Sequence, residues 1–235
     1  MRKYLAEFIG TFFLLFTIYC AVASGSTLAP LAIGAVLMAM VFAGGHISGA
    51  HYNPAVTLAV FLRGKLPARE ILPYVAAQVI GALAGAGAAR LVAGAPEGAA
   101  LSLTGSQLTG AFVAEAAVTF ALAYVVLNVA TSKSHPNNSF YGLAIGFTVL
   151  AGAVAVGSVS GGVFNPAVAV AVSAAGLISW KLIWLYLLAT LTGAGAAALA
   201  FRALNPADTA AAKPADTAAA KPAPARTAVA EAPAA

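Results

Sequence analysis

The stretch GHISGAHYNPAVT, residues 45–57, has a counterpart in SVSGGVFNPAVA, residues 158–169. In both, a Ser-Gly run leads to an Asn-Pro-Ala triplet, and an apolar run of about three helical turns follows. Asparagine before proline is typical of a helix start, because proline at the first helical position gives up only an amide hydrogen that would be unpaired anyway. Ten helical residues reach roughly 15 Å, half the hydrocarbon thickness of a bilayer. Two such half-helices that meet at their N-termini would span a membrane together and form a pore.

The triplets place two asparagines where a solute would pass. We predict half-helices from Pro54 to Leu62 and from Pro166 to Ala174, each capped by the preceding asparagine. A helix N-terminus carries about half a positive elementary charge and unpaired amide donors, so two of them at one site would repel cations and protons. The asparagine amides could donate to a passing oxygen. The predicted pore residues are Asn53, Pro54 and Ala55 in the first triplet and Asn165, Pro166 and Ala167 in the second.

The glycine-rich segments before the triplets cannot be regular helix. Irregular backbone at membrane depth is stable only where it packs within protein or lines water. We therefore expect backbone carbonyls of these segments to form a track of acceptors along the pore. These carbonyls belong to Gly49, Ala50, His51, Gly161 and Val163.

The composition indicates an integral membrane protein. Of the 235 residues, 61% are hydrophobic and only 8% are charged, and the mean hydropathy is +0.92. Long apolar stretches recur, a pattern typical of membrane-spanning helices. Six spans are predicted, at about residues 5–23, 28–45, 71–92, 108–130, 140–156 and 180–201. The expected fold is an all-α membrane protein with six transmembrane helices and two re-entrant half-helices.

The basic residues predict the orientation of these spans. If the spans alternate in direction, two basic residues, Arg90 and Lys181, fall on one side of the membrane. Seven fall on the other: Arg2, Lys3, Arg63, Lys65, Arg69, Lys133 and Arg202. This asymmetry places both termini in the cytoplasm of a multi-pass protein of the cell (inner) membrane. It also accounts for the net charge of +5 without nucleic-acid binding.

An internal repeat organises the chain. Asn53 and Asn165 lie 112 positions apart, and so do Tyr74 and Tyr186. Each half, about 1–95 and 108–204, holds three spans and one half-helix, so the two halves have opposite orientations and the half-helices enter from opposite faces. A single Asn-Pro-Ala triplet could be an ordinary helix cap, but paired copies at one spacing indicate a pore. Residues 1–204 are thus predicted to form one channel domain, and the alanine- and proline-rich residues 205–235 a disordered cytoplasmic tail.

These features together resemble the aquaporin family, the major intrinsic proteins. The resemblance covers roughly residues 4–202 and rests on AEFIGTFFL, GHISGAHYNPAV, SGGVFNPAV and the 3+3 inverted repeat. It implies an aquaporin-like fold, a homotetramer in the lipid bilayer, and passive permeation of water or small neutral solutes. It also implies that Glu7 and Glu115 are structural acids that hydrogen-bond the backbone of the re-entrant loops, since an unpaired buried carboxylate is costly in a membrane. We expect His46 to be a packed support of the first loop.

The sequence departs from the family at the selectivity filter. Most members follow the second triplet with arginine, whereas this chain has Val168 there. By alignment, the other filter positions are Ile33, Ala153 and Gly162. A strict water channel relies on a narrow polar constriction, and these residues predict a wide apolar one. The expected function is a passive channel for water and for glycerol-like polyols, urea or metalloid hydroxides such as arsenite.

Other classes of membrane protein fit less well. A water-selective aquaporin is the nearest alternative. A coupled secondary transporter would need titratable groups near the midplane, and only Glu7 and Glu115 are candidates. A purely structural membrane protein would show no flux. No nucleophile, base and acid converge and no metal-ligand cluster is evident in the sequence, so we predict no catalytic residue, no metal and no cofactor.

Overall fold

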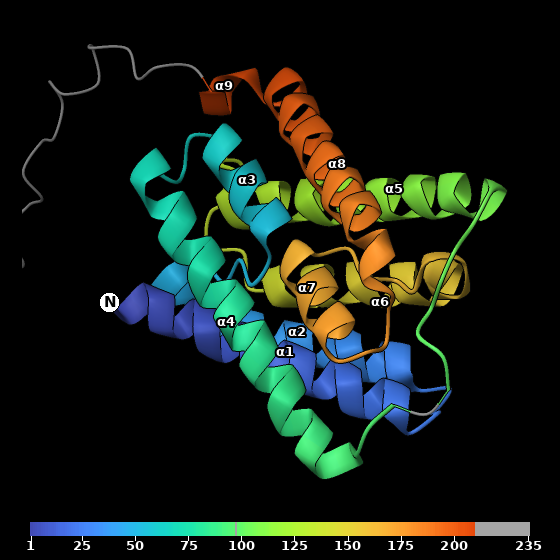
Figure 1. Ribbon diagram of the computed structural model, residues 1–235. Helices are drawn as coiled ribbons and strands as arrows, with labels where there is room; N and C mark the ends of the chain where they lie inside the picture. The colour runs from blue at the N-terminus through green and yellow to red at the C-terminus, as the bar shows by residue number, and fades with distance from the viewer. Residues whose placement is uncertain (97, 210–235) are drawn as a thin grey trace, which may run out of the picture.

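Six long apolar helices form a bundle in the computed structural model, which describes residues 1–96 and 98–209 (Figure 1). They are α1 (Arg2–Ala23), α2 (Ala29–Ser48), α4 (Ala68–Ala93), α5 (Ser106–Thr131), α6 (Tyr141–Ser160) and α8 (Ile183–Leu204), the last preceded by the 3-10 turn η1 (Trp180–Leu182). All six are long and apolar enough to cross a membrane, with η1 and α8 counted together. The predicted all-α fold with six spans is therefore confirmed.

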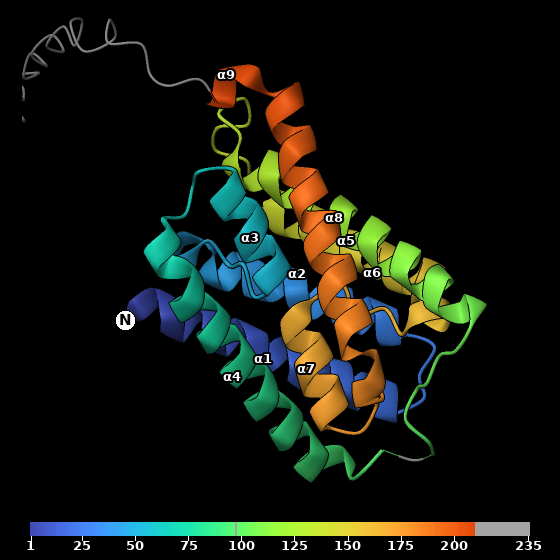
Figure 2. The ribbon, with the colours of Figure 1, turned by 45° about the horizontal axis from the view of Figure 1, so that its top comes forward.

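Two short helices lie between the long ones, at the middle of the bundle (Figure 2). They are α3 (Pro54–Leu62) and α7 (Pro166–Ala174), and both begin and end where the sequence predicted. Each starts at the proline that follows a capping asparagine. They are the two half-helices of the expected pore.

The two repeats pack in the same way. In the first, α1 lies against α2 and α4, and in the second, α5 lies against α6 and α8. Each half-helix also packs against the last long helix of the other repeat, α3 on α8 and α7 on α4. The halves are therefore interlocked, and each half-helix is held by both of them. This arrangement confirms the predicted 3+3 inverted repeat.

Close helix crossings depend on repeat-related glycines. A Cβ atom added to Gly193 in α8 would lie 2.3 Å from the carbonyl oxygen of Ala116 in α5. At Gly81 in α4 it would lie 2.5 Å from the carbonyl oxygen of Phe8 in α1. A backbone oxygen cannot swing aside as a long side chain can. Glycine at these two positions therefore sets how closely α8 and α4 approach the helices that anchor the re-entrant loops.

One end of the bundle, here named the basic face, carries most of the positive charge. It is defined by Arg2, Lys3, Arg63, Lys65, Arg69, Lys133 and Arg202. Contacts join residues from separate parts of the chain at this end. The Lys3 ammonium lies 2.7 Å from the Glu70 carboxylate, and the Arg202 guanidinium donates to the Leu62 carbonyl at 3.4 Å. The basic residues that were predicted to share one side do lie together.

The short helix α9 (Pro206–Thr209) binds to the basic face. The Arg63 guanidinium donates to the Asp208 carbonyl at 3.0 Å and lies 3.4 Å from its carboxylate. The same carboxylate accepts from the Lys133 amide at 3.1 Å, and the Phe201 ring lies 4.8 Å from the guanidinium carbon. Both Arg63 and Asp208 are buried. The predicted tail begins at residue 205, yet residues 206–209 are helical and held in place; residues 210–235 lie outside the described residues.

Gly193→Ala should destabilise the fold. Its added methyl group would overlap the Ala116 carbonyl and push α8 away from α5, at a cost of about 1–3 kcal/mol. Gly195→Ala is the matched control, because a Cβ there meets nothing within 4 Å. Thermal unfolding in detergent should show a lower midpoint for Gly193→Ala only. Equal midpoints for the two variants would contradict the close crossing.

Asp208→Asn should also lower the unfolding midpoint, because it leaves the buried Arg63 guanidinium without its charged partner. Burial alone would raise the pKa of the Asp208 carboxyl, but hydrogen bonds from Ser132 and Lys133 and the charge of Arg63 outweigh it and hold the pKa below its usual value. A depressed pKa means that the contribution is present at neutral pH and is lost as the pH falls below about 3.9. Asp216→Asn changes the second copy of the sequence PADT and serves as the control. A drop of the same size in both variants would exclude a specific role for Asp208.

Candidate functional site

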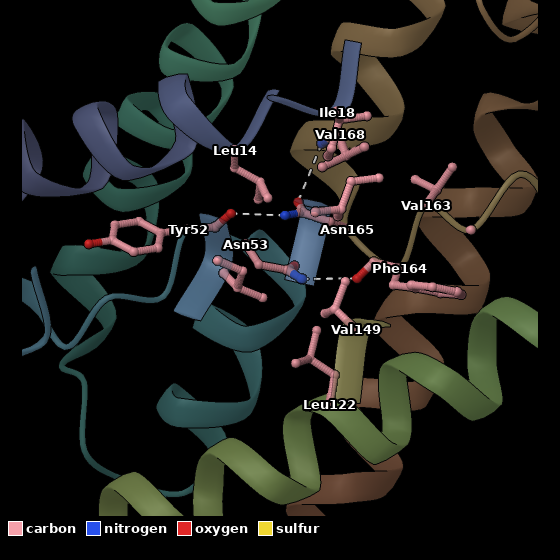
Figure 3. A pocket seen from close by; sticks show the side chains of 13 residues that line it. Leu14, Ile18, Tyr52, Asn53, Leu122, Val149, Val163, Phe164, Asn165 and Val168 are labelled. Carbon is pink, nitrogen blue, oxygen red and sulfur yellow. Dashed lines mark hydrogen bonds between the residues drawn. The ribbon is translucent and has the colours of Figure 1, made fainter. Parts of the chain in front are cut away.

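The N-termini of the two half-helices meet at the centre of the bundle, each capped by its asparagine (Figure 3). The Asn53 Oδ1 atom accepts a hydrogen bond from the Ala55 amide at 2.8 Å. The Asn165 Oδ1 atom accepts one from the Ala167 amide at 2.9 Å. The side-chain oxygens are therefore committed to the helices, and the side-chain NH₂ groups face away from them.

Each asparagine also reaches across to the loop of the other repeat. The Asn53 Nδ2 atom donates to the Phe164 carbonyl, and the Asn165 Nδ2 atom donates to the Tyr52 carbonyl, both at 2.9 Å (Figure 3). An amide NH₂ group has two hydrogens, so one on each asparagine is left for another acceptor. The cross-bonds fix the direction of these donors. The centre of the bundle thus holds two oriented donors at the positive ends of two helices.

The loops before the triplets share one irregular backbone. Left-handed φ angles occur at equivalent positions: Gly49 (87°), Ala50 (51°) and Tyr52 (49°) in the first loop, and Gly161 (88°), Gly162 (65°) and Phe164 (51°) in the second. For the non-glycine residues this conformation costs on the order of 1 kcal/mol each. As predicted, neither loop is regular helix. Each therefore needs partners outside itself to hold its shape.

Glu7 of α1 holds the first loop. Its carboxylate accepts hydrogen bonds from the backbone amides of His51 at 2.9 Å and Tyr52 at 2.7 Å. The Ser48 hydroxyl donates to it at 2.6 Å and the Gln78 side chain at 2.8 Å. Glu7 has no solvent-exposed surface. A fully buried carboxylate that accepts four hydrogen bonds has a structural role: it supports the loop, and we call this contact a brace.

Glu115 of α5 holds the second loop in the same way. It accepts from the amides of Val163 at 2.9 Å and Phe164 at 2.6 Å, and from the Ser160 hydroxyl at 2.7 Å. It too is fully buried. Both acids therefore make the kind of contact that the resemblance implied for them.

Two tyrosines that sequence reasoning did not connect with the re-entrant loops complete these braces. The Tyr74 hydroxyl donates to the Ser48 carbonyl at 2.8 Å, and the Tyr186 hydroxyl donates to the Ser160 carbonyl at 2.6 Å. Each contact satisfies the last carbonyl of the helix that leads into a re-entrant loop. The equal repeat spacing of the two tyrosines was the available signal, but it could not show what they bind.

The histidines near the first triplet differ from each other. The His51 ring is buried, with its Nδ1 atom 3.1 Å from the Thr57 hydroxyl and its centroid 5.0 Å from that of Tyr74. His46 was expected to be a packed support of the loop, and this prediction is wrong. It is exposed on α2 and lines a cavity at the basic face. The resemblance led to this expectation, and the sequence does not show that this stretch of α2 borders open space.

Cavities lie on both sides of the asparagine pair along the bundle. An outer cavity of about 390 Å³ lies away from the basic face and includes Ile33, Ala153, Gly162 and Val168 in its wall. A central cavity of about 30 Å³ includes both asparagines. Two inner cavities, of about 380 and 330 Å³, lie at the basic face. All four predicted filter positions thus border one space.

The loop residues expected to supply carbonyls divide between these spaces. Gly49 lines both inner cavities and His51 lines one of them. Gly161 and Val163 line the outer cavity. Ala50 is instead buried and packs within the apolar core. The two loops therefore border open space on opposite sides of the asparagine pair, as the inverted repeat requires.

The walls of the outer and central cavities carry no charged side chain among the described residues. In the same part of the chain, no group of three or more His, Cys, Asp or Glu side chains is placed to hold a metal ion. The chemistry available at the centre is the donation of hydrogen bonds by two asparagines in an otherwise apolar passage. This arrangement suits an uncharged molecule that carries an acceptor oxygen.

Comparison with known proteins agrees with this geometry. The family described as Major intrinsic protein matches residues 1–201. The chain is 38% identical over 219 residues to "Glycerol uptake facilitator protein-like 6" of Lactiplantibacillus plantarum, with 88% of this chain and 100% of that protein covered. It is also 38% identical to "Aquaporin NIP1-1" of Zea mays, over 87% of this chain and 75% of that protein. The X-ray structure of the aquaglyceroporin from Plasmodium falciparum has the same fold, with a TM-score of 0.74 at 22% identity over 88% of this chain and 98% of that one.

The family match spans both repeats, both half-helices and both buried acids. Sequence, fold and site geometry therefore agree. The chain belongs to the major intrinsic protein family, whose members are channels rather than enzymes.

Proposed function

We propose that this chain passively conducts water and small uncharged solutes, such as glycerol-like polyols, urea or metalloid hydroxides such as arsenite. The observation that carries the proposal is the wall of the outer cavity at Ile33, Ala153, Gly162 and Val168. None of these four residues has a charge, an aromatic ring or a polar side chain. A channel that admits water alone relies on a narrow polar constriction. The outer cavity has a volume of about 390 Å³, and these four positions give its wall no polar side chain.

Val168 is central to this proposal. It lies in the first turn of α7 and lines both the outer and the central cavity. An arginine at this position, as in most members of the family, would project charge and hydrogen-bond donors into the passage. Valine leaves the passage open to solutes with an alkyl backbone. The name of the Lactiplantibacillus plantarum relative, a glycerol uptake facilitator-like protein, supports the same class of solute.

A water-selective channel is the second candidate, and the size of the central cavity favours it. On the same measure of volume, a water molecule needs about 10–15 Å³. The central cavity of about 30 Å³ therefore has room for roughly two water molecules. Coupled transport has less support, since Glu7 and Glu115 are fully buried and their carboxylates accept hydrogen bonds from the loops.

The setting of the channel is part of the proposal. We infer a homotetramer in the cell (inner) membrane with both termini in the cytoplasm. The basic face supports this orientation, because positive charge is enriched on the cytoplasmic side of membrane proteins. Large apolar side chains on the outside of the bundle, such as Leu72, Leu91 and Leu199, suit contact with lipid or with other subunits.

Val168→Arg should narrow the channel toward water. The longer charged side chain would fill part of the outer cavity and lower glycerol permeability by roughly tenfold or more, a barrier increase of about 1.4 kcal/mol. Water permeability should change much less. Stopped-flow light scattering on proteoliposomes with water, glycerol, urea and arsenite gradients measures both effects.

Val168→Met is the matched control, because it adds length to the side chain without charge. It should retain more glycerol permeability than Val168→Arg. If the unmodified protein passes water but none of the three solutes faster than protein-free vesicles, the water-selective alternative is correct. If no variant passes water, the channel itself is excluded.

A further inference from the structure

An apolar belt separates the asparagine pair from the basic face. It consists of three pairs of residues on three helices: Leu37 and Val41 of α2, Leu122 and Val126 of α5, and Ile145 and Val149 of α6. All six side chains are buried. Within each pair the residues are four positions apart, so they stack on one helix face across about 6 Å of its length. The belt is therefore one helical turn thick and contains no polar side chain.

The cavities place this belt across the passage. Leu37, Leu122 and Val149 line the central cavity, and Leu122 and Val149 lie beside Asn53 in Figure 3. The other three members line the inner cavities, Val126 one of them and Val41 and Ile145 the other. A solute that moves from the asparagines to the basic face must therefore pass through the belt.

The passage is continuous on the outer side of the asparagines and interrupted on the inner side. The central and outer cavities share wall residues: Ile18, Ile33, Gly162, Val163 and Val168. The central cavity shares no wall residue with either inner cavity. The outer cavity has a volume of about 390 Å³, and the central cavity, which Ile33, Gly162 and Val168 also line, has about 30 Å³. Open space is found again only beyond the belt.

We propose that this apolar belt, and not the set of filter positions, is the constriction that limits which solutes pass and how fast. The inference rests on the proposed function, because it concerns the selectivity of that same pore. A solute in the belt loses the water around it and finds no side-chain partner to replace it. Narrow apolar segments limit flux in this way. The cost rises with the size and the polarity of the solute, so the belt discriminates between solutes.

The inverted repeat supplies a matched pair of residues for the test. Ile33 and Ile145 lie 112 positions apart in the same LAIG sequence. Ile33 is in the wall of the outer and central cavities, whereas Ile145 belongs to the belt and lines an inner cavity. Truncation of either to alanine removes the same atoms. The two variants therefore differ in where along the pore the space is gained.

The experiment compares Ile145→Ala, Ile33→Ala and the unmodified protein in proteoliposomes, with glycerol and water permeability measured per channel. Ile145→Ala should raise glycerol permeability by roughly tenfold, several times more than Ile33→Ala raises it. A larger rise for Ile33→Ala, or equal rises for the two variants, would overturn the proposal. Both variants are first compared by thermal unfolding and by reconstituted amount.

Val149→Leu tests the belt in the opposite direction and does not rely on a cavity-forming variant. It matches the residue at this position to its repeat counterpart Leu37 and narrows the belt, so glycerol permeability should fall more than water permeability. Unchanged glycerol permeability would contradict the belt. If the unmodified protein passes water but no glycerol, the proposed function fails. The belt is then tested by water permeability alone, which Ile145→Ala should raise more than Ile33→Ala does.

Discussion

This structure depends on one kind of contact, in which a buried carboxylate accepts hydrogen bonds from two consecutive backbone amides. Glu7 and Glu115 each make it, one for each re-entrant loop. Unpaired amides at membrane depth cost several kcal/mol each, and both loops also contain residues with left-handed φ angles. Without the carboxylates neither loop could hold its shape in a bilayer. With them, each half-helix begins at the centre of the bundle, and Asn53 and Asn165 can cap their helices and bond across to the opposite loop.

The sequence predicted the framework well because local chemistry marks it. Asn53 and Asn165 precede the prolines that start the half-helices, and the repeat spacing shows that the two triplets occupy equivalent positions. The bounds of both half-helices were therefore predicted correctly. Contacts between distant segments leave no such mark. The bonds of Tyr74 and Tyr186 to the braces and the burial of Asp208 against Arg63 depend on how the helices pack. The prediction for His46 was wrong for the same reason, since the sequence does not show which part of a helix borders a cavity.

The two repeats have the same backbone plan but present different surfaces to a solute. Away from the basic face, the second loop borders a wide apolar cavity with Val168 in its wall. Toward the basic face, the first loop borders cavities that carry His46, His51 and basic side chains. Between them lie the positive ends of two helices and a belt of aliphatic side chains. With no charged side chain in the walls of the outer and central cavities among the described residues, two features disfavour cations: the helix dipoles at the asparagines and the apolar segment beside them.

The most direct test of the pore is chemical block at Val168. Cys20 is the chain's only native cysteine, so Val168→Cys in a Cys20→Ser background places a single thiol at the meeting of the outer and central cavities. A bulky thiol reagent applied to both sides of proteoliposomes should abolish water and glycerol permeability in this variant and leave the Cys20→Ser protein unaffected. Full labelling of the new cysteine with undiminished permeability to both would show that solutes do not pass between the two half-helices.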